Sequence, residues 1–231
     1  MKKNILYTML FAMVALLASS CGDKESEGLS RFTYYPTIEL EGGNYIVWDK
    51  GTPWQEPGYS SVLNGEDVTS EVTIAGNVDT STSGIYNLTY VTKKNEDGFD
   101  ASASRTVVVL DPNSDIEGFY LTQPDSYRNY NGADAAYGRA FEILVIDNGD
   151  GTLTVDDLLG GWYCQRAGYG SNYAMSGTIA LDGSAVSLVD SYIPGWGDGL
   201  VGLTGTYADG VFTIEAEYVS SMKFFQTWVK E

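Results

Sequence analysis

Short alternating segments separated by turn-forming residues dominate this 231-residue sequence and restrict what it can fold into. Runs of β-branched and aromatic residues recur between Gly, Asn, Asp and Pro, and beyond residue 20 no segment sustains the 3.6-residue period of a helix. In Ile85–Tyr90, the side chains of Tyr86, Leu88 and Tyr90 share one face, which suits a strand with one face in a core and the other in water. The sequence therefore predicts an all-β protein.

The predicted strands fall into two groups. The first half of the chain contains Thr37–Leu40, Tyr45–Trp48, Val72–Ala75, Gly84–Val91 and Ser104–Leu110. The second half contains Gly118–Leu121, Arg139–Ile146, Thr152–Val155, Gly161–Cys164, Met175–Leu181, Ala185–Val189, Leu203–Tyr207, Val211–Tyr218 and Phe224–Val229. Pro112 cannot donate to a strand ladder, so we predict one domain at 34–111, a linker at 112–115 and a second domain at 116–231. Asp-Gly turns join many second-half strands, which predicts an antiparallel β-meander, either a lipocalin-like barrel or a sandwich.

The N-terminus has the features of an export signal. Lys2 and Lys3 precede the apolar run Ile5–Ala18, which is too short for a comfortable membrane span, and small residues then precede Cys21. The segment resembles the signal peptide and lipobox of bacterial lipoproteins. This resemblance implies cleavage after residue 20, lipidation of Cys21 and attachment to a membrane through the lipid. The alternative is an ordinary signal peptide in which Cys21 is coincidental.

An acidic segment follows the predicted cleavage site. Asp23, Glu25 and Glu27 lie in the predicted tether 21–33, which resembles the surface-export signal of Bacteroidetes lipoproteins. The resemblance implies an outer-membrane protein that is exposed at the cell surface. The alternative is that these charges only keep a tether solvated.

The first domain resembles a known module over most of its length. The matching segments are Gly51–Tyr59, Gly65–Thr69, Val72–Ser81, Gly84–Tyr90 and Ser104–Val109. Together they look like the immunoglobulin-like domain of bacterial surface proteins, a seven-stranded sandwich related to hyalin-repeat modules, which implies a spacer. The whole arrangement resembles Bacteroides-type lipoproteins, and its architecture is similar to that of accessory glycan-binding lipoproteins of starch-utilisation-type systems.

Composition excludes several classes of function. The sequence has no histidine, which rules out Ser-His-Asp triads and histidine-held metals. Thirteen basic residues face 31 acidic ones, so a net charge of −18 argues against nucleic-acid binding. With Cys21 lipidated, Cys164 is the remaining thiol, and beside Trp162 and Tyr163 we expect it to be buried and unreactive. No cofactor is expected.

The segment Asp147–Leu153 invites comparison with a calcium-binding loop. Aligning Gly151 with the invariant glycine of an EF-hand puts Asn148 and Asp150 at ligand positions. The first ligand position then falls on Ile146, which has no side-chain oxygen, and no helix precedes it. A β-turn between two strands explains the same residues, so no metal site is predicted.

Aromatic residues supply the candidate ligand-binding groups, because sugar rings stack on Trp and Tyr while polar side chains bind their hydroxyl groups. We expect Trp54, Trp162 and Trp228 to lie in the cores. Three segments are predicted to be loops: 127–132, 166–173 and 193–199. They contain the candidate binding residues Trp196, Tyr127, Tyr130, Tyr169, Tyr173, Arg128 and Asn129. Trp196 is expected either to form a binding platform or to plug one end of the barrel.

Carboxylates are the remaining candidates for acid–base chemistry. Glu215 and Glu217 share a strand face, whereas Asp156 and Asp157 do not, and no motif orients either pair for glycoside hydrolysis. We therefore expect no catalytic residues and no enzyme activity. The leading hypothesis is a cell-surface lipoprotein that binds an extracellular polysaccharide or oligosaccharide through its second domain. The alternative is a structural or adhesive subunit that meets an outer-membrane protein partner, and a hydrolase is a distant third.

Overall fold

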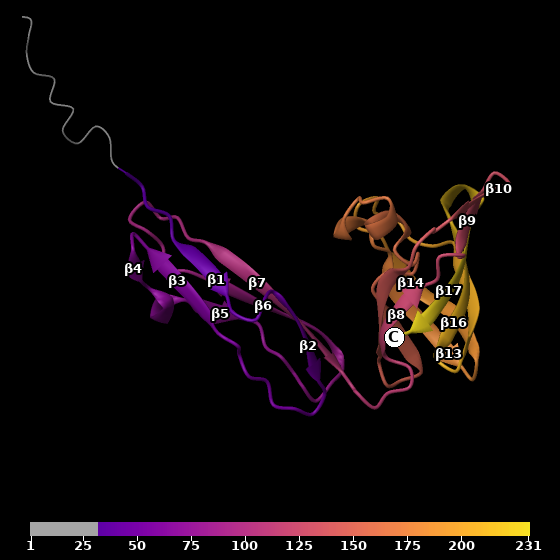
Figure 1. Ribbon diagram of the computed structural model, residues 1–231, viewed down its shortest axis with the longest axis horizontal. Coiled ribbons are helices and arrows are strands. Elements are labelled where there is room, and N and C mark those ends of the chain that lie inside the picture. Colours follow the sequence, from indigo (N-terminus) through magenta and orange to yellow (C-terminus); the bar gives the residue numbers. More distant parts are fainter. Residues whose placement is uncertain (1–31) are drawn as a thin grey trace, which may run out of the picture.

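The computed structural model describes residues 32–231 (Figure 1). The predicted signal peptide, Cys21 and the tether up to residue 31 lie outside the described residues. The described chain is built almost entirely from strands and is organised as an elongated β domain followed by a β-barrel (Figure 1). The prediction of an all-β protein is confirmed. Among residues 32–231, no helix has the length and apolar character needed to cross a membrane.

The first domain is an immunoglobulin-like sandwich of two sheets. One sheet has the order β1 (Thr37–Leu40), β3 (Tyr59–Leu63), β4 (Glu66–Asp67). The other has the order β2 (Tyr45–Asp49), β7 (Ser102–Leu110), β6 (Gly84–Val91), β5 (Thr73–Ala75), and only its β2–β7 pair is parallel. A single 3₁₀ turn, η1 (Thr69–Glu71), follows β4. The sequence analysis missed β3 and β4 because their Ser and acidic residues give little hydrophobic alternation.

A buried charge lies in the middle of this sandwich. Arg105 on β7 is fully buried and forms an ion pair with Glu56, with 3.0 Å between Nη1 and Oε1. Its Nη2 donates hydrogen bonds to the carbonyl oxygens of Glu41 and Gly58, at 2.8 and 3.0 Å. The hydroxyl of Tyr90 donates to the other Glu56 oxygen at 2.6 Å. Arg105 therefore ties a core strand to the two loops that connect the sheets.

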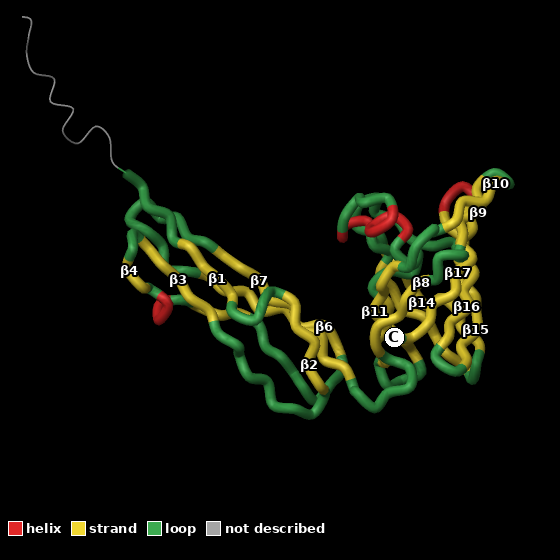
Figure 2. The backbone as a smooth tube through the Cα atoms, viewed as in Figure 1, coloured by secondary structure: helices red, strands yellow, loops and turns green. Residues whose placement is uncertain are grey.

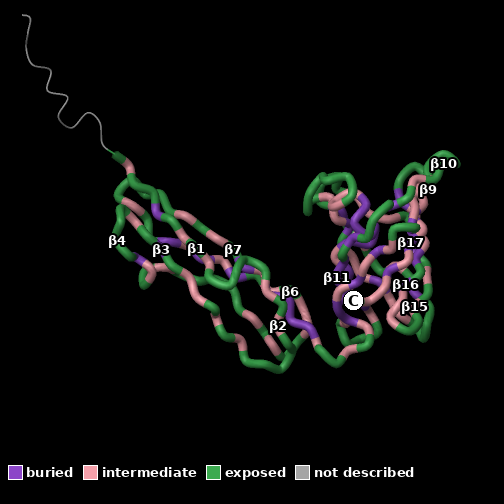
Figure 3. The backbone as a smooth tube through the Cα atoms, in the orientation of Figure 1, coloured by how far each residue is buried: buried purple, intermediate pink, exposed green. Residues whose placement is uncertain are grey.

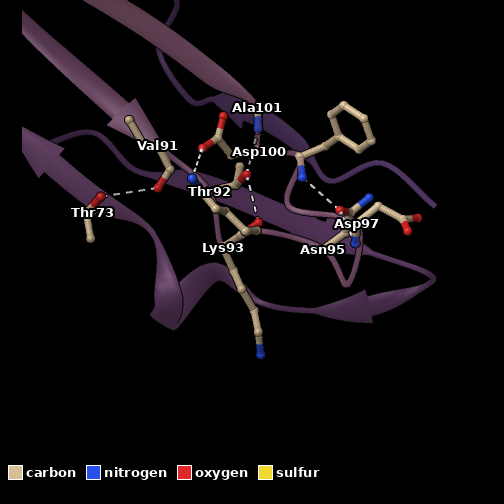
Figure 4. Close-up of polar contacts among 10 residues, drawn as sticks. Thr73, Val91, Thr92, Lys93, Asn95, Asp97, Asp100 and Ala101 are labelled. Carbon is tan, nitrogen blue, oxygen red and sulfur yellow. Dashed lines mark hydrogen bonds and ion pairs between the residues drawn. The ribbon is translucent and has the colours of Figure 1, made fainter. Parts of the chain in front are cut away.

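The β6–β7 connection closes on its own polar side chains (Figure 4). Thr92 and Ala101 exchange bonds, because Thr92 N donates to the Ala101 carbonyl and Ala101 N donates to Thr92 Oγ1, both at 2.9 Å. Asn95 Oδ1 accepts bonds from the backbone N–H groups of Asp97 and Phe99, at 3.0 and 2.9 Å. The loop at this end of the domain is therefore held together by hydrogen bonds between its own side chains and its backbone.

The second domain is an antiparallel barrel, which decides between the two predicted alternatives. Its strands are β8 (Gly118–Thr122), β11 (Phe141–Asp147), β12 (Thr152–Val155), β13 (Ser176–Asp182), β14 (Ala185–Tyr192), β15 (Gly202–Ala208), β16 (Val211–Tyr218) and β17 (Met222–Lys230). Each pairs with the next, and β17 pairs with β8 to close the ring. The hairpin β9 (Tyr127–Tyr130)–β10 (Ala133–Ala136) continues the sheet from the first half of β17.

Side chains fill the barrel interior, so it is a packed core. Buried residues recur along the barrel strands in the backbone coloured by burial (Figure 3). Trp228 and Trp162 are buried there, as predicted. Trp54 is only half-buried, against expectation. It packs edge-on against Trp48 on the first domain, with 4.9 Å between the ring centroids. Large residues from every strand contribute to this core, including Tyr120, Ile143, Val155, Ile179, Val186, Leu203, Phe212, Ile214 and Phe224. A ligand must therefore bind outside the barrel lumen.

Two local predictions were wrong. Gly161–Cys164 is not a strand, because Gly160 and Gly161 both have a left-handed backbone (φ 57° and 83°) and lead into the single-turn π-helix η2 (Trp162–Arg166). Segment 127–132 is not a loop, because Tyr127–Tyr130 pairs with β17 as strand β9. Two further turns complete the described elements: the 3₁₀ turn η3 (Ser171–Tyr173) and the tight turn η4 (Val219–Ser221).

The two domains share a small buried interface. Val108 and Leu110 of β7 pack against Leu144 and Ile146 of β11. Glu117, which is almost fully buried, accepts hydrogen bonds from the Asp111 N–H, from Ser83 Oγ at 2.8 Å and from the Asp147 N–H at 3.2 Å. One carboxylate therefore joins the first domain to the barrel.

Candidate functional site

Five aromatic side chains gather at one end of the barrel and form what we call the aromatic cluster: Tyr163, Tyr169, Tyr173, Trp196 and Tyr218. The short helical segments lie at the same end (Figure 2). The Trp196 ring centroid lies 4.7 Å from that of Tyr163, 4.9 Å from Tyr173, and 6.3 Å from both Tyr169 and Tyr218. Three chain segments contribute to this cluster: 156–175, 193–201 and the end of β16.

Asp157 organises the segment that carries the three tyrosines. Its carboxylate accepts bonds from the backbone N–H groups of Leu159 at 3.0 Å, Gly161 at 3.1 Å and Met175 at 3.2 Å. Burial raises the pKa of Asp157 to about 7, although these three donors favour the charged form. The side chain joins the two ends of the segment, so it sets the position of the cluster without contacting it.

Glycine at position 195 allows the turn with Trp196 to dock closely. The backbone N–H of Gly195 donates to the Asn172 carbonyl at 2.6 Å, and Gly197 N donates to the Ile193 carbonyl at 2.8 Å. A Cβ atom on residue 195 would lie 2.6 Å from ring carbon Cδ1 of Tyr173, where no side chain fits. Trp196 is therefore held in an irregular turn by contacts on both of its sides.

Tyr169, Tyr173 and Trp196 line an open hollow of about 370 Å³. Tyr169 is 56% exposed and Trp196 is 43% exposed, so both keep apolar ring surface in contact with water. The Trp196 plane lies at 88° to Tyr169 and 66° to Tyr173. These rings form a corner instead of a flat platform, which suits a single ring-shaped ligand gripped from two sides.

Polar groups border the cluster. Tyr218 donates a hydrogen bond to Asp198 Oδ1 at 2.6 Å, and burial together with this carboxylate raises the pKa of Tyr218. Burial also raises the pKa of Tyr163, while the nearby Arg128 guanidinium lowers it. These tyrosines therefore stay protonated at neutral pH, and Asp198 and Arg128 bring charges of opposite sign to this border.

The candidate residues from the sequence divide into two groups. Trp196, Tyr169 and Tyr173 meet in the cluster, whereas the four candidates on β9 are split by the alternation of the strand. Arg128 points toward the buried Trp162, with Cζ 4.9 Å from the ring centroid and 5.8 Å from that of Tyr130.

On the other face of β9, Tyr127 stacks on Phe225 at 4.8 Å. Asn129 donates to Asp134 across the hairpin at 2.6 Å. These two residues therefore do not reach the aromatic cluster.

Three members of the site escaped the sequence analysis. Tyr163 lies in the segment that was assigned to a strand, and Tyr218 ends a strand that was correctly assigned. Asp198 lies within the candidate loop 193–199, but its bond to Tyr218 crosses 20 positions of the sequence. The glycine pair before Trp162 was the signal that could have placed Tyr163 in a loop.

The other sequence candidates take structural roles. Residues 148–151 form the turn of the β11–β12 hairpin, so a turn lies in this segment as predicted. Asp150 Oδ1 accepts from both Thr152 N and Thr152 Oγ1, at 3.0 and 2.6 Å. Within residues 32–231, no three acidic or thiol side chains are grouped to hold a metal ion. Cys164 is half-buried instead of fully buried, and burial raises its pKa. Glu215 lies on the outer barrel surface, 2.7 Å from Lys223.

These features define an all-β protein in which an immunoglobulin-like domain precedes an eight-stranded barrel with an aromatic cluster at one end. A family model for the bacterial surface protein Ig-like domain matches residues 38–109, and a model described as a C-terminal domain matches residues 109–230. The crystal structure of lipoprotein BT2262 from Bacteroides thetaiotaomicron is similar, with 37% identity and a TM-score of 0.69 over 85% of this chain and 100% of that chain. This chain belongs to the family of that Bacteroides lipoprotein.

A second solved structure contains CBM51-2 in complex with GlcNAc and the INT domains from Clostridium perfringens ZmpB. It shares 16% identity with a TM-score of 0.28, over 52% of this chain and 31% of that chain, and it carries no argument about fold or function. The search of curated proteins found no match.

Proposed function

We propose that this protein is a non-catalytic, cell-surface lipoprotein that binds an extracellular carbohydrate through the aromatic cluster. The exposed corner formed by Tyr169, Tyr173 and Trp196 carries the proposal. Sugar rings expose C–H groups on their faces, and aromatic rings at steep angles to one another can contact a sugar on two sides. Asp198 lies at the border of the cluster, where it can accept hydrogen bonds from sugar hydroxyl groups.

The arrangement of the acidic residues supports binding without catalysis. Glycoside hydrolysis requires two carboxyl groups on either side of the scissile bond, about 5 to 10 Å apart. Asp157 is buried and accepts hydrogen bonds from backbone N–H groups, and Asp156 accepts a hydrogen bond from Leu144 N at 2.7 Å. Glu215 pairs with Lys223 on the barrel wall. None of these three carboxylates borders the hollow at Trp196.

We propose that lipid on Cys21 anchors the chain in the outer membrane, with the barrel facing outward. The lipobox resemblance and the similarity to a Bacteroides lipoprotein support this part of the proposal. The immunoglobulin-like domain then acts as a spacer. Its buried contacts with the barrel through Leu110, Ile146 and Glu117 favour a stiff spacer over a flexible one.

A screen of residues 22–231 against immobilised saccharides tests the function. The panel contains neutral α-glucans, β-glucans, xylans and mannans, with alginate and heparin as acidic comparators. We expect retention on at least one neutral saccharide and none on the acidic ones, because residues 22–231 carry 31 acidic residues against 11 basic ones. Failure to bind any saccharide of the panel contradicts the proposal.

A second candidate function is a structural or adhesive role with a protein partner. The exposed apolar residues Val189, Tyr192 and Val201, at the end of β14 and in the connection to β15, favour it. Co-purification of a defined outer-membrane protein that is lost on Val201→Ser supports this alternative, and an unchanged yield argues against it.

A further inference from the structure

A groove of about 550 Å³ runs over the outer face of β15, β16 and β17, away from the lumen. Cross-strand register builds its floor from two rows. One row is Thr206, Thr213 and Thr227, and the next row is Thr204, Glu215 and Phe225. Asp125 and Ser126 lie on the border of the groove, where Ser126 Oγ accepts from Thr227 N at 3.0 Å.

The threonine hydroxyl groups of this floor are free to bind a ligand. Within the described chain, the hydroxyl groups of Thr204, Thr206, Thr213 and Thr227 make no hydrogen bond to another protein group, although all four line the groove. In the β11–β12 turn, by contrast, Thr152 Oγ1 donates to Asp150 at 2.6 Å. The groove therefore presents a two-dimensional array of hydroxyl groups that can both donate and accept.

A stacked pair of aromatic rings, Tyr127 and Phe225, lies beside these threonines. Tyr127 on β9 covers one face of the Phe225 ring, with centroids 4.8 Å apart and planes at 22°. Since β17 lies between β9 and β16 in the sheet, the other face of Phe225 is turned toward Glu215 and the threonine rows. Tyr127 covers one face of the ring, so the face of Phe225 that lines the groove can contact an apolar ligand surface.

The charges in and around the groove restrict its ligand. Glu215 and Asp125 line it, no Lys or Arg is among its lining residues in the described chain, and Lys223 is paired with Glu215 at 2.7 Å. An acidic ligand would be repelled, and a purely apolar ligand would leave four hydroxyl groups unsatisfied. A neutral chain of polyhydroxylated rings can hydrogen-bond with the threonine hydroxyl groups and can also place its C–H groups against the Phe225 ring.

We propose that this groove is a second carbohydrate-binding face, which takes a neutral glycan chain along the outside of the barrel. The inference depends on the proposed function for its class of ligand but uses none of the residues of the aromatic cluster. A protein strand is a weaker occupant, because the floor strands β15, β16 and β17 already pair with one another and leave no free strand edge there.

Affinity gel electrophoresis of residues 22–231 in the neutral polysaccharide that retains the wild type best tests the groove. The double variant Thr206→Val/Thr213→Val removes two hydroxyl groups and keeps the shape and strand preference of the floor. We expect it to weaken binding roughly fivefold, as the loss of two ligand hydrogen bonds of modest net strength implies. Phe225→Leu keeps an apolar side chain, removes the flat ring face and is expected to weaken binding similarly. Thr89→Val, which removes a strand hydroxyl in the first domain, is the matched control.

The outcomes separate the two binding faces. Unchanged binding by both groove variants overturns this inference, and the proposed function stands if Trp196→Ala still weakens binding. Weakened binding by the groove variants with an unaffected Trp196→Ala supports the groove and moves the function away from the aromatic cluster. A wild type that no polysaccharide retains overturns both. Melting temperatures equal to that of the wild type show that the variants fold.

Discussion

The ring of Tyr173 packs directly against the backbone of Gly195, at a position where a Cβ atom would lie 2.6 Å from ring carbon Cδ1. This contact connects the segment that follows β12 to the turn that carries Trp196. Gly195→Ala should therefore displace Tyr173 from Trp196 and open the corner, because an aromatic ring held on both sides cannot absorb such an overlap.

We expect Gly195→Ala to lower saccharide affinity several-fold and to leave the barrel folded, as measured by affinity gel electrophoresis and circular dichroism. Gly197→Ala in the same turn is the comparison variant. Its φ of 73° strains the backbone, but no atom lies within 4 Å of the added Cβ, so it tests strain in the turn without a clash against Tyr173. If Gly195→Ala binds the saccharide as tightly as the wild type does, the corner formed by Tyr173 and Trp196 does not bind the ligand.

Stability should fall as the pH rises from 5 to 8. Burial raises the pKa of Asp157 to about 7 and that of Asp156 to about 6, whereas an unfolded aspartate titrates near 4. The folded state then binds more protons than the unfolded state between pH 4 and 7, so the free energy of unfolding decreases across that range. For Asp157 alone the expected loss between pH 5 and 8 is about 2.5 kcal/mol.

Urea denaturation at several pH values measures this dependence. Asp157→Asn cannot titrate, so we expect a variant that is less stable at pH 5 but depends less on pH. A pH dependence as steep as that of the wild type would mean that Asp157 is ionised in the folded protein throughout.

The buried ion pair of the first domain should be sensitive to loss of one partner. Glu56→Ala leaves the fully buried Arg105 without its carboxylate and frees the Tyr90 hydroxyl. We expect a loss of about 3 kcal/mol in the free energy of unfolding of this domain. Glu71→Ala breaks the exposed pair with Lys93 and should cost under about 1 kcal/mol. Equal effects of the two substitutions would contradict the structural role of Arg105.

The carboxylate of Glu117 should control the motion between domains. Glu117→Ala removes the shared acceptor of Ser83, Asp111 and Asp147, while the apolar contacts around Leu110 remain. We expect small-angle scattering to report a broader distribution of overall dimensions for the variant than for the wild type. Identical profiles would assign the stiffness of the joint to the apolar contacts alone.

Much of the fold follows from local sequence. Gly84–Val91, Thr152–Val155 and Val211–Tyr218 have the predicted bounds, because their side-chain alternation and flanking turns agree with the final packing. β9 was missed because Tyr127–Tyr130 places one tyrosine and one polar residue on each face, so neither face is apolar. Its strand conformation comes from pairing with β17, nearly 100 residues away.

The candidate site was only partly predictable for the same reason. Loop aromatics such as Trp196, Tyr169 and Tyr173 stand out in the sequence, since glycines around them break any strand. The roles of Tyr218 and of Asp157 depend on long-range contacts that one sequence does not encode locally. The threonine array of the outer groove likewise appears only when the register of β15, β16 and β17 is known.

The affinity of Trp196→Ala for a retained neutral saccharide tests the central claim most directly. Trp196 is 43% exposed within the cluster, and Tyr192, 53% exposed outside it, provides a matched control through Tyr192→Ala. We predict that Trp196→Ala weakens binding at least about tenfold, with an unchanged melting temperature, and that Tyr192→Ala binds as the wild type does. Equal retention of Trp196→Ala and the wild type would contradict carbohydrate binding at the aromatic cluster.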